Sequence, residues 1–376
     1  RLASYDLAVL GGGISGLGAA EAALRKGLSV ILLEKGQVCK ATSDNSLRII
    51  HGGFRYLQSL NMKRVLQSVS AQRELLDRFP EYITELPCVM PLKGFSLKGP
   101  LAASVALTLY RLLSSSAGKR VREQGLRSHS WVREVLPFLE ELAPKGVLLW
   151  SDAQLHAPEA FSHKLVALLK EGGAHVVENA AVTKIDHKKE GFQVAVTIEG
   201  HNEQIEARSV VNTLGPWIRS IEHSCALGFP ELAWCKGFNL VLGRKLEDRY
   251  GVGIQSQDGR LLFMTPRKDV SVIGTWYIPI EDPTQSHEIS DQELDWALTM
   301  FNNSIPNFEL TRDDIRYTEV GVLPMQSVGK TGPVLYGSEL YLHHSAYLEV
   351  VSTKYTTFQS QGEKAVQLIE RYLQRS

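Results

Sequence analysis

The first 34 residues constrain the fold more than any other part of the chain. Asp6 to Leu10 is a short apolar run typical of a buried strand, and it leads directly into the glycine-rich stretch Gly11-Gly-Gly-Ile-Ser-Gly16. The alanine-rich stretch from Leu17 to Lys26 favours a helix, and a second apolar run from Ser29 to Leu33 ends at Glu34. Strand, glycine turn, helix and strand in this order predict a βαβ unit with parallel strands.

Each glycine of the turn has a physical role in holding a dinucleotide. Gly11 allows the tight turn, Gly13 lets a pyrophosphate approach the backbone, and Gly16 lets the helix pack closely on the sheet. The N-terminus of the helix offers unpaired N–H groups to the phosphates. Glu34 lies 18 residues after Gly16, where a carboxylate accepts hydrogen bonds from a ribose and repels a 2′-phosphate. We therefore expect a dinucleotide other than NADP, since a merely structural glycine turn would not require this acid.

Composition excludes several classes of partner. The chain has 376 residues, of which 44% are hydrophobic, so it is long enough for two domains with sizeable cores. Its formal net charge of zero gives no reason to expect nucleic acid as a partner. The four cysteines show no metal-ligating spacing with histidine. We therefore expect reduced thiols, no metal site and a cytoplasmic protein.

The most apolar window covers 101–113 and is too short to cross a bilayer. Basic residues flank it, among them Lys98 and Lys119. The favoured interpretation is a buried helix of the second domain. The alternative is a helix that lies on the cytoplasmic surface of a membrane, with its basic ends toward the lipid headgroups.

The rest of the chain alternates between helical and extended patterns, which predicts two domains built from separate pieces. Apolar periodicity favours helices at 57–79, 161–171, 291–301 and 356–374. Extended patterns predict a three-stranded meander over 181–208, a strand over 314–323 that turns at Pro324, and a final strand over 340–351. The Rossmann-like nucleotide-binding domain is expected to comprise 1–80, 149–220 and 335–376. The substrate-binding domain, with a mixed sheet, is expected to comprise 81–148 and 221–334. The predicted fold class is α/β, with an α+β second domain.

A hydroxyl-rich loop follows the ribose-binding acid and ends in a distinctive stretch. Ala41-Thr-Ser-Asp-Asn-Ser46 and Ile50-His-Gly-Gly-Phe-Arg-Tyr-Leu57 resemble the Thr/Ser loop and the His-Gly-Gly-hydrophobic-Arg-Tyr-Leu signature of one family. This is the family of FAD-dependent glycerol-3-phosphate dehydrogenases, within the D-amino-acid-oxidase-like flavoproteins. Weaker matches follow in the same order at 150–152, 212–217, 271–275 and 354–357. The resemblance covers nearly the whole chain. The family's usual C-terminal helical extension is not part of this sequence, either because it is absent or because it has been cut away.

The resemblance implies FAD bound in an extended form. The pyrophosphate would be held by Gly11, Gly13, Ser15 and Gly16, and the adenosine ribose would be flanked by Glu34 and Lys35. Further groups along the cofactor would contact Thr42, Ser43, Ser46, Val182, Gly215, Trp217, Thr353 and Thr357. The residues alone agree in one respect: a hydroxyl-rich loop directly after the ribose-binding acid suits a cofactor longer than NAD. Thr and Ser are also common turn formers, which is the alternative interpretation for each of them.

The implied reaction is the transfer of a hydride from a carbon that bears a hydroxyl to flavin N5, with the protein positioning the substrate. Arg55 is the expected anchor, because its planar guanidinium binds a carboxylate or phosphate bidentately; a structural ion pair is the alternative. Tyr56 is expected to donate to a substrate oxygen or to be a packed aromatic. Lys354 is expected to be a substrate-side cation or a solvated lysine. His51 is expected to accept a proton or to be held by backbone or flavin.

The chain departs from the family where the family binds phosphate and accepts the proton. Leu323 stands in Gly321-Val-Leu-Pro-Met325 where the family has an arginine, and 338–342 holds no counterpart of its second arginine. Asn239 ends Lys236-Gly-Phe-Asn where the family has a histidine. A charge-assisted hydrogen bond contributes about 1.5–3 kcal/mol, so losing two such arginines would weaken phosphate binding substantially. Arg267, Lys268 and Lys330 are the cations that we consider as substitutes.

Three hypotheses therefore stay open. The first is an FAD-dependent dehydrogenase of a small hydroxylated substrate, with glycerol 3-phosphate as the leading named candidate. The second is an FAD-dependent oxidase or dehydrogenase of an amino acid or secondary amine. The third is a flavin-binding module with little catalysis. The electron acceptor, quinone or oxygen, is not indicated by the sequence.

Overall fold

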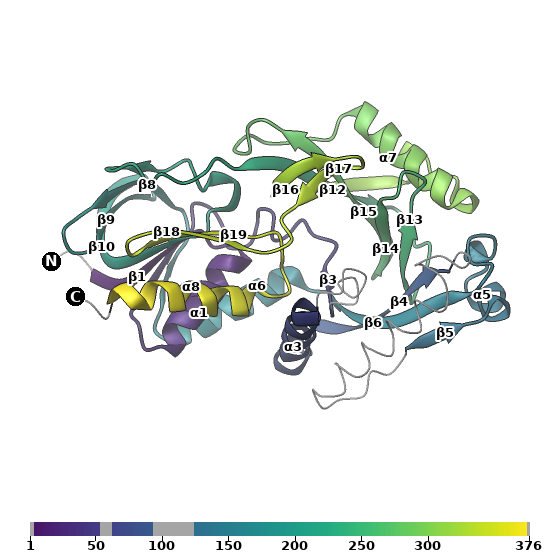
Figure 1. The fold of residues 1–376 in the computed structure, drawn as a ribbon, viewed down its shortest axis with the longest axis horizontal. Coiled ribbons are helices and arrows are strands. Elements are labelled where there is room, and N and C mark those ends of the chain that lie inside the picture. Colours follow the sequence, from purple (N-terminus) through teal and green to yellow (C-terminus); the bar gives the residue numbers. More distant parts are fainter. Residues whose placement is uncertain (1–3, 53–61, 93–123, 374–376) are drawn as a thin grey trace.

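The computed structural model describes residues 4–52, 62–92 and 124–373. Two large sheets lie next to each other along the longest axis of the molecule, each with its own helices (Figure 1). The first and last described elements both belong to the left-hand half of that view. Within the described ranges, none of the helices has both the length and the hydropathy that crossing a bilayer requires.

The predicted βαβ unit is confirmed and forms the start of the first sheet. β1 (Ser4–Leu10), α1 (Ile14–Arg25) and β2 (Val30–Leu33) follow one another, and the two strands pair in parallel. Leu7 to Leu10 and all of β2 are buried, which is why these runs are apolar on both faces. Gly11 ends β1 with φ +99°, a conformation that glycine adopts without strain.

The first sheet has nine strands arranged around β10 (His201–Asn212). The C-terminal half of β10 pairs in parallel with β1 and with β19 (Tyr347–Val351). Its N-terminal half pairs antiparallel with β9 (Phe192–Ile198), which pairs in turn with β8 (Ala180–His187), so the predicted meander is confirmed. The sheet is completed by β7 (His175–Val177) beside β2, β11 (Glu222–His223) beside β8, and β18 (Leu340–His344) beside β19.

Helices α1, α6 (Pro158–Glu171) and α8 (Phe358–Leu373) lie together beside this sheet (Figure 1). α1 and α8 approach each other backbone to backbone, because Gly18 and Gly362 meet at the contact. A Cβ on Gly362 would overlap the Gly18 carbonyl group. The N- and C-terminal ends of the sequence are thereby fixed against each other around one apolar cluster that also includes Phe161 and Phe358.

The second sheet is mixed and has ten strands. Its order begins with β17 (Gly332–Leu335), β16 (Ile315–Gly329), β12 (Ala233–Leu242), β15 (Val270–Ile280) and β14 (Leu261–Arg267). It continues with β13 (Gly251–Gln255), β4 (Ile83–Pro91), β6 (Val147–Leu155) and β3 (Ile49–Ile50), and β5 (Gly125–Arg127) pairs with β6. α7 (Asp291–Ser304) and α5 (His129–Val135) pack on its core.

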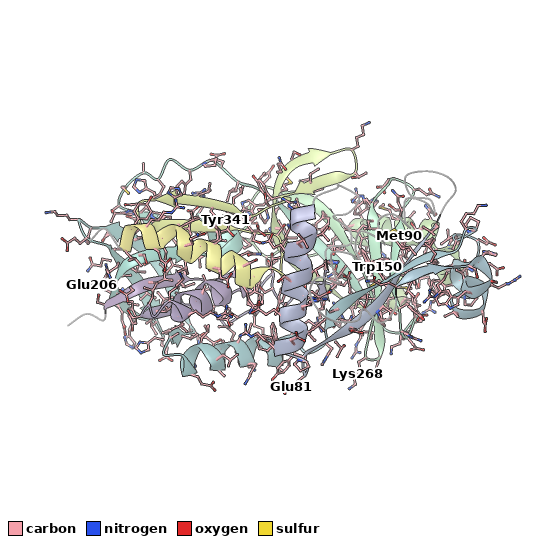
Figure 2. All side chains as sticks on the ribbon, turned by 60° about the horizontal axis from the view of Figure 1, so that its bottom comes forward. Glu81, Met90, Trp150, Glu206, Lys268 and Tyr341 are labelled. Carbon is pink, nitrogen blue, oxygen red and sulfur yellow. The ribbon has the colours of Figure 1, made fainter. Side chains whose placement is uncertain are left out.

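α3 (Met62–Arg78) stands between the two halves of the molecule. Figure 2 shows it upright, with Glu206 and Tyr341 on one side and Met90 and Trp150 on the other. Both sheets draw strands from alternating stretches of the sequence. The residue bounds that we assign to the two domains stay a prediction.

Two strand predictions were wrong in detail. The single strand expected over 340–351 is a hairpin of β18 and β19, with Ser345 at φ 57° in the turn. The expected turn at Pro324 is absent from the described chain, since β16 runs through this residue to Gly329. Pro324 is tolerated because β16 pairs there with β12 alone; its pairing with β17 begins one residue later, next to a register shift. The apolar window 101–113 lies outside the described residues.

Candidate cofactor and substrate site

A cavity of about 720 Å³ is lined by residues from both sheets, and its size is that of a small-molecule site. It brings together most of the residues that the sequence predicts for the site. These are Gly11, Gly13, Ser15, Glu34, Lys35, Thr42, Ser43, Ser46, His51, Gly215, Trp217, Thr353, Lys354 and Thr357.

Among the described residues, two predicted site residues do not line this cavity, and two further ones fall outside the described ranges. Gly16 lies beneath the turn, where a Cβ would overlap the Gly11 carbonyl oxygen. Val182 lies on β8, two residues beyond Ala180, whose N–H donates to the Glu34 carbonyl at 2.8 Å. Arg55 and Tyr56 lie outside the described residues. The roles of these four residues stay predictions.

The glycine turn leaves open space where phosphates would lie. Gly13 is the N-cap of α1 and lines the cavity, and the nearest atom to a Cβ placed there is the Ser43 hydroxyl at 3.4 Å. The N–H of Ile14 donates to the same hydroxyl at 3.0 Å. A helix N-terminus that meets a hydroxyl-rich loop in this way can hold a pyrophosphate, so the fold fits the predicted dinucleotide at this end.

The acid that follows β2 is held in place by the backbone around it. Glu34 accepts hydrogen bonds from the N–H of Gly12 at 2.7 Å and of Gly36 at 2.8 Å, one on each carboxylate oxygen. Each oxygen keeps a second lone pair, which suits the two hydroxyls of a ribose. The Lys35 ammonium lies 3.3 Å from the centroid of the Trp217 ring. Burial lowers the pKa of Lys35, and the neighbouring Glu34 charge opposes this shift.

Part of the hydroxyl-rich loop is structural. The Thr42 hydroxyl accepts from the N–H of Val322 and donates to its carbonyl oxygen, both at 3.1 Å. It therefore fastens the loop to β16 of the second sheet. The Ser46 hydroxyl accepts from the N–H of Arg48 at 3.1 Å. Both side chains line the cavity, but these hydrogen bonds use part of the capacity that the sequence analysis assigned to the cofactor.

The segment before α8 closes another side of the cavity. The Thr353 hydroxyl donates to the Tyr336 carbonyl at 3.1 Å, and the Lys354 ammonium donates to the Gly337 carbonyl at 2.8 Å. Gln361 donates to the Thr357 hydroxyl at 3.0 Å and accepts from the Ser15 hydroxyl at 3.2 Å. α8 is in this way tied to the start of α1 across the phosphate end of the cavity.

His51 is held by a buried carboxylate. Its Nδ1 lies 3.2 Å from Asp152 Oδ2, while the N–H of Gly52 donates to Asp152 Oδ1 at 2.7 Å. Asp152 also accepts a hydrogen bond from the Trp150 indole N–H at 3.2 Å. A carboxylate at Nδ1 favours the tautomer with its proton on that nitrogen, which leaves Nε2 as the proton acceptor. The sequence analysis noted 150–152 only as a weak match and missed this role of Asp152.

A buried ion cluster beside the cavity was also missed. Glu319 on β16 receives two hydrogen bonds from Arg267, at 2.6 and 3.1 Å, and one from Arg48 at 3.3 Å. Arg48 lines the cavity, while the side chains of Arg267 and Glu319 are 10% and 5% exposed. Two guanidinium groups share one carboxylate, which leaves a net positive charge beside the cavity. Burial and the Arg267 charge lower the pKa of Arg48, and Glu319 opposes this shift.

One of the two substituted positions belongs to this cluster, and the other lines the cavity. Asn239 is buried, donates to Glu319 at 3.4 Å and accepts from the Thr275 hydroxyl at 2.7 Å. Its amide is therefore engaged with the cluster. Leu323 lines the cavity and presents an apolar surface there. Arg267, considered above as a substitute for the missing arginines, does not line the cavity within the described chain; it supports Glu319 instead.

Comparison with known proteins shows which proteins this chain is similar to. The family of FAD dependent oxidoreductases (DAO) matches residues 6–347. Relatives include a glycerol-3-phosphate dehydrogenase from Synechocystis sp., 26% identical over 99% of this chain and 71% of the relative. A D-erythritol 1-phosphate dehydrogenase from Brucella abortus is 28% identical over 96% of this chain and 72% of the relative.

A solved structure has the same fold. The glycerol-3-phosphate dehydrogenase from Bacillus halodurans, complexed with FAD, matches with a TM-score of 0.74 and 19% identity. The match covers 99% of this chain and 65% of that chain. The chain thus spans about two thirds of the length of the proteins that it resembles.

Proposed function

The chain belongs to the FAD-dependent oxidoreductase family, and we propose that it oxidises the carbinol carbon of a small hydroxylated substrate that carries an anionic group. A polyol phosphate such as glycerol 3-phosphate is the leading candidate. Bound FAD supplies the hydride acceptor at flavin N5. The proposal concerns the substrate and the residues that handle it.

We assign the cofactor to the cavity residues of the first sheet. The pyrophosphate would be held by Gly13, Ser43 and the N-terminus of α1. These groups border open space, which a Cβ on Gly13 would partly fill. Glu34 would hold the adenosine ribose, with lone pairs that its backbone contacts leave available. The segment containing Thr353 would lie toward the flavin end, as the resemblance implies.

The observation that carries the substrate proposal is the position of Arg48. Its guanidinium lines the cavity, its side chain is 19% exposed, and Glu319 holds it in place. No described residue accepts a hydrogen bond from its buried Nε. A cation held in this way suits a phosphate or carboxylate. It would replace one of the two arginines that the chain lacks relative to the family.

We assign the hydroxyl proton to His51. Asp152 orients the imidazole and stabilises the cation that forms when Nε2 accepts the proton. Asn239 would not take this proton, because its amide is hydrogen-bonded to Glu319 and Thr275 and amides are not basic. Proton acceptor and anion anchor would then both come from the segment 48–51.

The test is anaerobic reduction of the bound flavin, followed by the loss of its absorbance. The panel contains sn-glycerol 3-phosphate, glycerol, small hydroxy acids, D-amino acids and sarcosine. We expect reduction by glycerol 3-phosphate and not by glycerol. Reduction by sarcosine or a D-amino acid alone would replace the proposal with amine oxidation. Reduction by no member of the panel would favour a flavin-binding module.

A variant pair tests the anion anchor separately. Arg48→Met is expected to retain FAD and to raise the substrate concentration for half-maximal reduction by at least about 10-fold, since a charge-assisted bond contributes about 1.5–3 kcal/mol. Arg244→Met is the matched control, because Arg244 pairs with Asp314 in an exposed position outside the cavity lining. Equal behaviour of the two variants would refute the role of Arg48.

The electron acceptor is tested separately. Reoxidation of the reduced enzyme by oxygen or by a soluble quinone would identify it.

A further inference from the structure

Three side chains with metal-binding chemistry meet on the first sheet, outside the cavity lining. These are His187, Cys225 and His344, whose ligand atoms all lie within 4.8 Å of one another. They come from the end of β8, the segment after β11 and the end of β18. Because they are 38 and 119 residues apart in the sequence, no spacing motif reveals them. The sequence analysis therefore expected no metal here.

A third imidazole lies next to this group. His223 Nδ1 is 3.3 Å from His187 Nε2. A tetrahedron with bonds of about 2.0–2.1 Å has an N···N edge of about 3.3–3.4 Å, so these two nitrogens already have the separation of two zinc ligands. A hydrogen bond between the two rings is the alternative explanation of this distance. It does not account for the approach of Cys225 and His344 to His187.

The backbone presents these side chains from a defined framework. β11 pairs in parallel with β8, with His223 beside Ile185. The N–H of His187 donates to the Ser224 hydroxyl at 2.8 Å, and the N–H of Ser224 donates to the Ile185 carbonyl at 3.1 Å. Ligands held on paired strands keep their mutual positions better than ligands on free loops.

The hairpin of β18 and β19 supplies the other side of the group. His344 opposes Tyr347 in the hairpin. The Tyr347 ring packs on both His187 and His223, with centroid distances of 6.0 and 4.9 Å. His344 lies 5.8 Å from His187 between ring centroids. The Tyr347 ring therefore restricts the orientation of the His187 and His223 imidazoles.

The group is accessible from solvent. Cys225 is half-buried and His344 is exposed, so an ion can reach the ligand atoms.

We propose that His187, His223, Cys225 and His344 form a binding site for Zn²⁺. Three imidazoles and one thiolate suit this ion, which prefers four nitrogen and sulfur ligands in a tetrahedron. On binding, the Cys225 thiol releases its proton to solvent and becomes the thiolate ligand. Because the site joins β8 and β11 to the hairpin of β18 and β19, the ion has a structural role: it ties the edge strand β11 and its neighbour β8 to this hairpin.

The test uses the FAD-loaded protein, freed of metal by a chelator and dialysis. We expect one Zn²⁺ per chain to be retained after a second dialysis against zinc-free buffer, and the unfolding temperature to rise on zinc addition. Co²⁺ as a spectroscopic probe is expected to give tetrahedral d–d bands and a thiolate-to-cobalt band in the difference spectrum, both lost on zinc addition. Absence of stoichiometric binding, or a cobalt spectrum without the thiolate band, would overturn the proposal.

Variants separate this site from adventitious binding. Cys225→Ser and His344→Ala each remove a ligand, and each is expected to weaken zinc binding by at least about 100-fold, more than the loss of an outer-shell partner. His344 is exposed, so its replacement leaves the fold intact if Cys225→Ser does not. His201→Ala is the matched control, an exposed histidine on β10 of the same sheet. Zinc binding that both ligand variants retain at the affinity of the control would refute the site.

Discussion

Replacing Glu319 with glutamine removes the carboxylate that lies between two partly buried arginines. The side chain keeps its size and one acceptor oxygen, so the change is chiefly one of charge. In the structure, the Glu319 carboxylate accepts hydrogen bonds from the two terminal guanidinium nitrogens of Arg267 and from one of Arg48. Without its charge, the two cations would repel each other in a site where the Glu319 and Arg267 side chains are only 5% and 10% exposed.

The expected cost follows from burial. Breaking a buried ion pair by removing one partner costs about 3–5 kcal/mol, because the remaining charge is left uncompensated. Because the glutamine amide oxygen can still accept a hydrogen bond from an arginine, we expect Glu319→Gln to lower the free energy of unfolding by about 3 kcal/mol, the lower end of this range. A chain of this size changes its unfolding temperature by about 1.3 °C per kcal/mol. We therefore expect a decrease of about 4 °C in the FAD-free protein.

An exposed pair provides the matched control. Arg312 binds Asp295 bidentately through Nε and one terminal nitrogen, at 2.7 and 2.6 Å, but these side chains are 44% and 57% exposed. Because exposed ion pairs contribute little to stability, Asp295→Asn is expected to lower the unfolding temperature much less than Glu319→Gln. Both variants are measured by thermal scanning and by urea unfolding followed by tryptophan fluorescence. If the two substitutions destabilise the protein equally, burial is not what makes Glu319 important, and the reasoning fails.

Three further predictions follow from the same structure. Gly13→Ala is expected to weaken FAD binding while changing the stability of the FAD-free protein by no more than about 0.5 kcal/mol. Gly16→Ala is expected to lower both the FAD affinity and the stability, because its Cβ would overlap a backbone carbonyl. An equal loss of stability in the two variants would contradict this difference. His51→Asn is expected to retain FAD and to slow flavin reduction by about 10²–10⁴-fold, and an unchanged rate would exclude His51 as the proton acceptor. Burial raises the pKa of Glu349 to about 7, with partial opposition from Arg219, so its contribution to stability is present below its ordinary pKa of 4.5 and is lost as the pH rises toward 7. Relative to Glu349→Gln, the wild-type protein should lose about 3 kcal/mol of unfolding free energy over that range; a constant difference measured by urea unfolding at several pH values would refute this.

Sequence reasoning predicted best those positions that local backbone geometry determines. Gly11, Gly13 and Glu34 line the cavity, and they belong to a turn and two strands that lie within 34 residues. Their roles toward the cofactor stay predictions, but their positions can be derived from the spacing alone, because a βαβ unit has few possible geometries. The same holds for the apolar runs of β1 and β2, which are buried on both faces.

Long-range contacts set the limit of such reasoning. The resemblance assigns Thr42 to the cofactor, and Thr42 lines the cavity. Its hydroxyl is also hydrogen-bonded to the backbone of Val322 in the other sheet. The continuation of β16 through Pro324 likewise depends on which neighbouring strand pairs at that residue. Neither fact is contained in the local sequence, because each depends on where a distant strand lies.

The ion cluster shows why the substituted positions cannot be judged one at a time. Counting Leu323 and Asn239 as losses assumes that each position acts alone. In the structure, Asn239 shares Glu319 with Arg48 and Arg267, so the residue that replaces a histidine is part of the group that holds a cation at the cavity. The cluster needs a donor toward the carboxylate and an acceptor for Thr275, and a primary amide supplies both. Because the amide is engaged in this way, the proposed function assigns the proton to His51 and the anion to Arg48, and both residues line the cavity. If an anion is held from the side of 48–51, as we propose, an arginine at the position of Leu323 on β16 is not required.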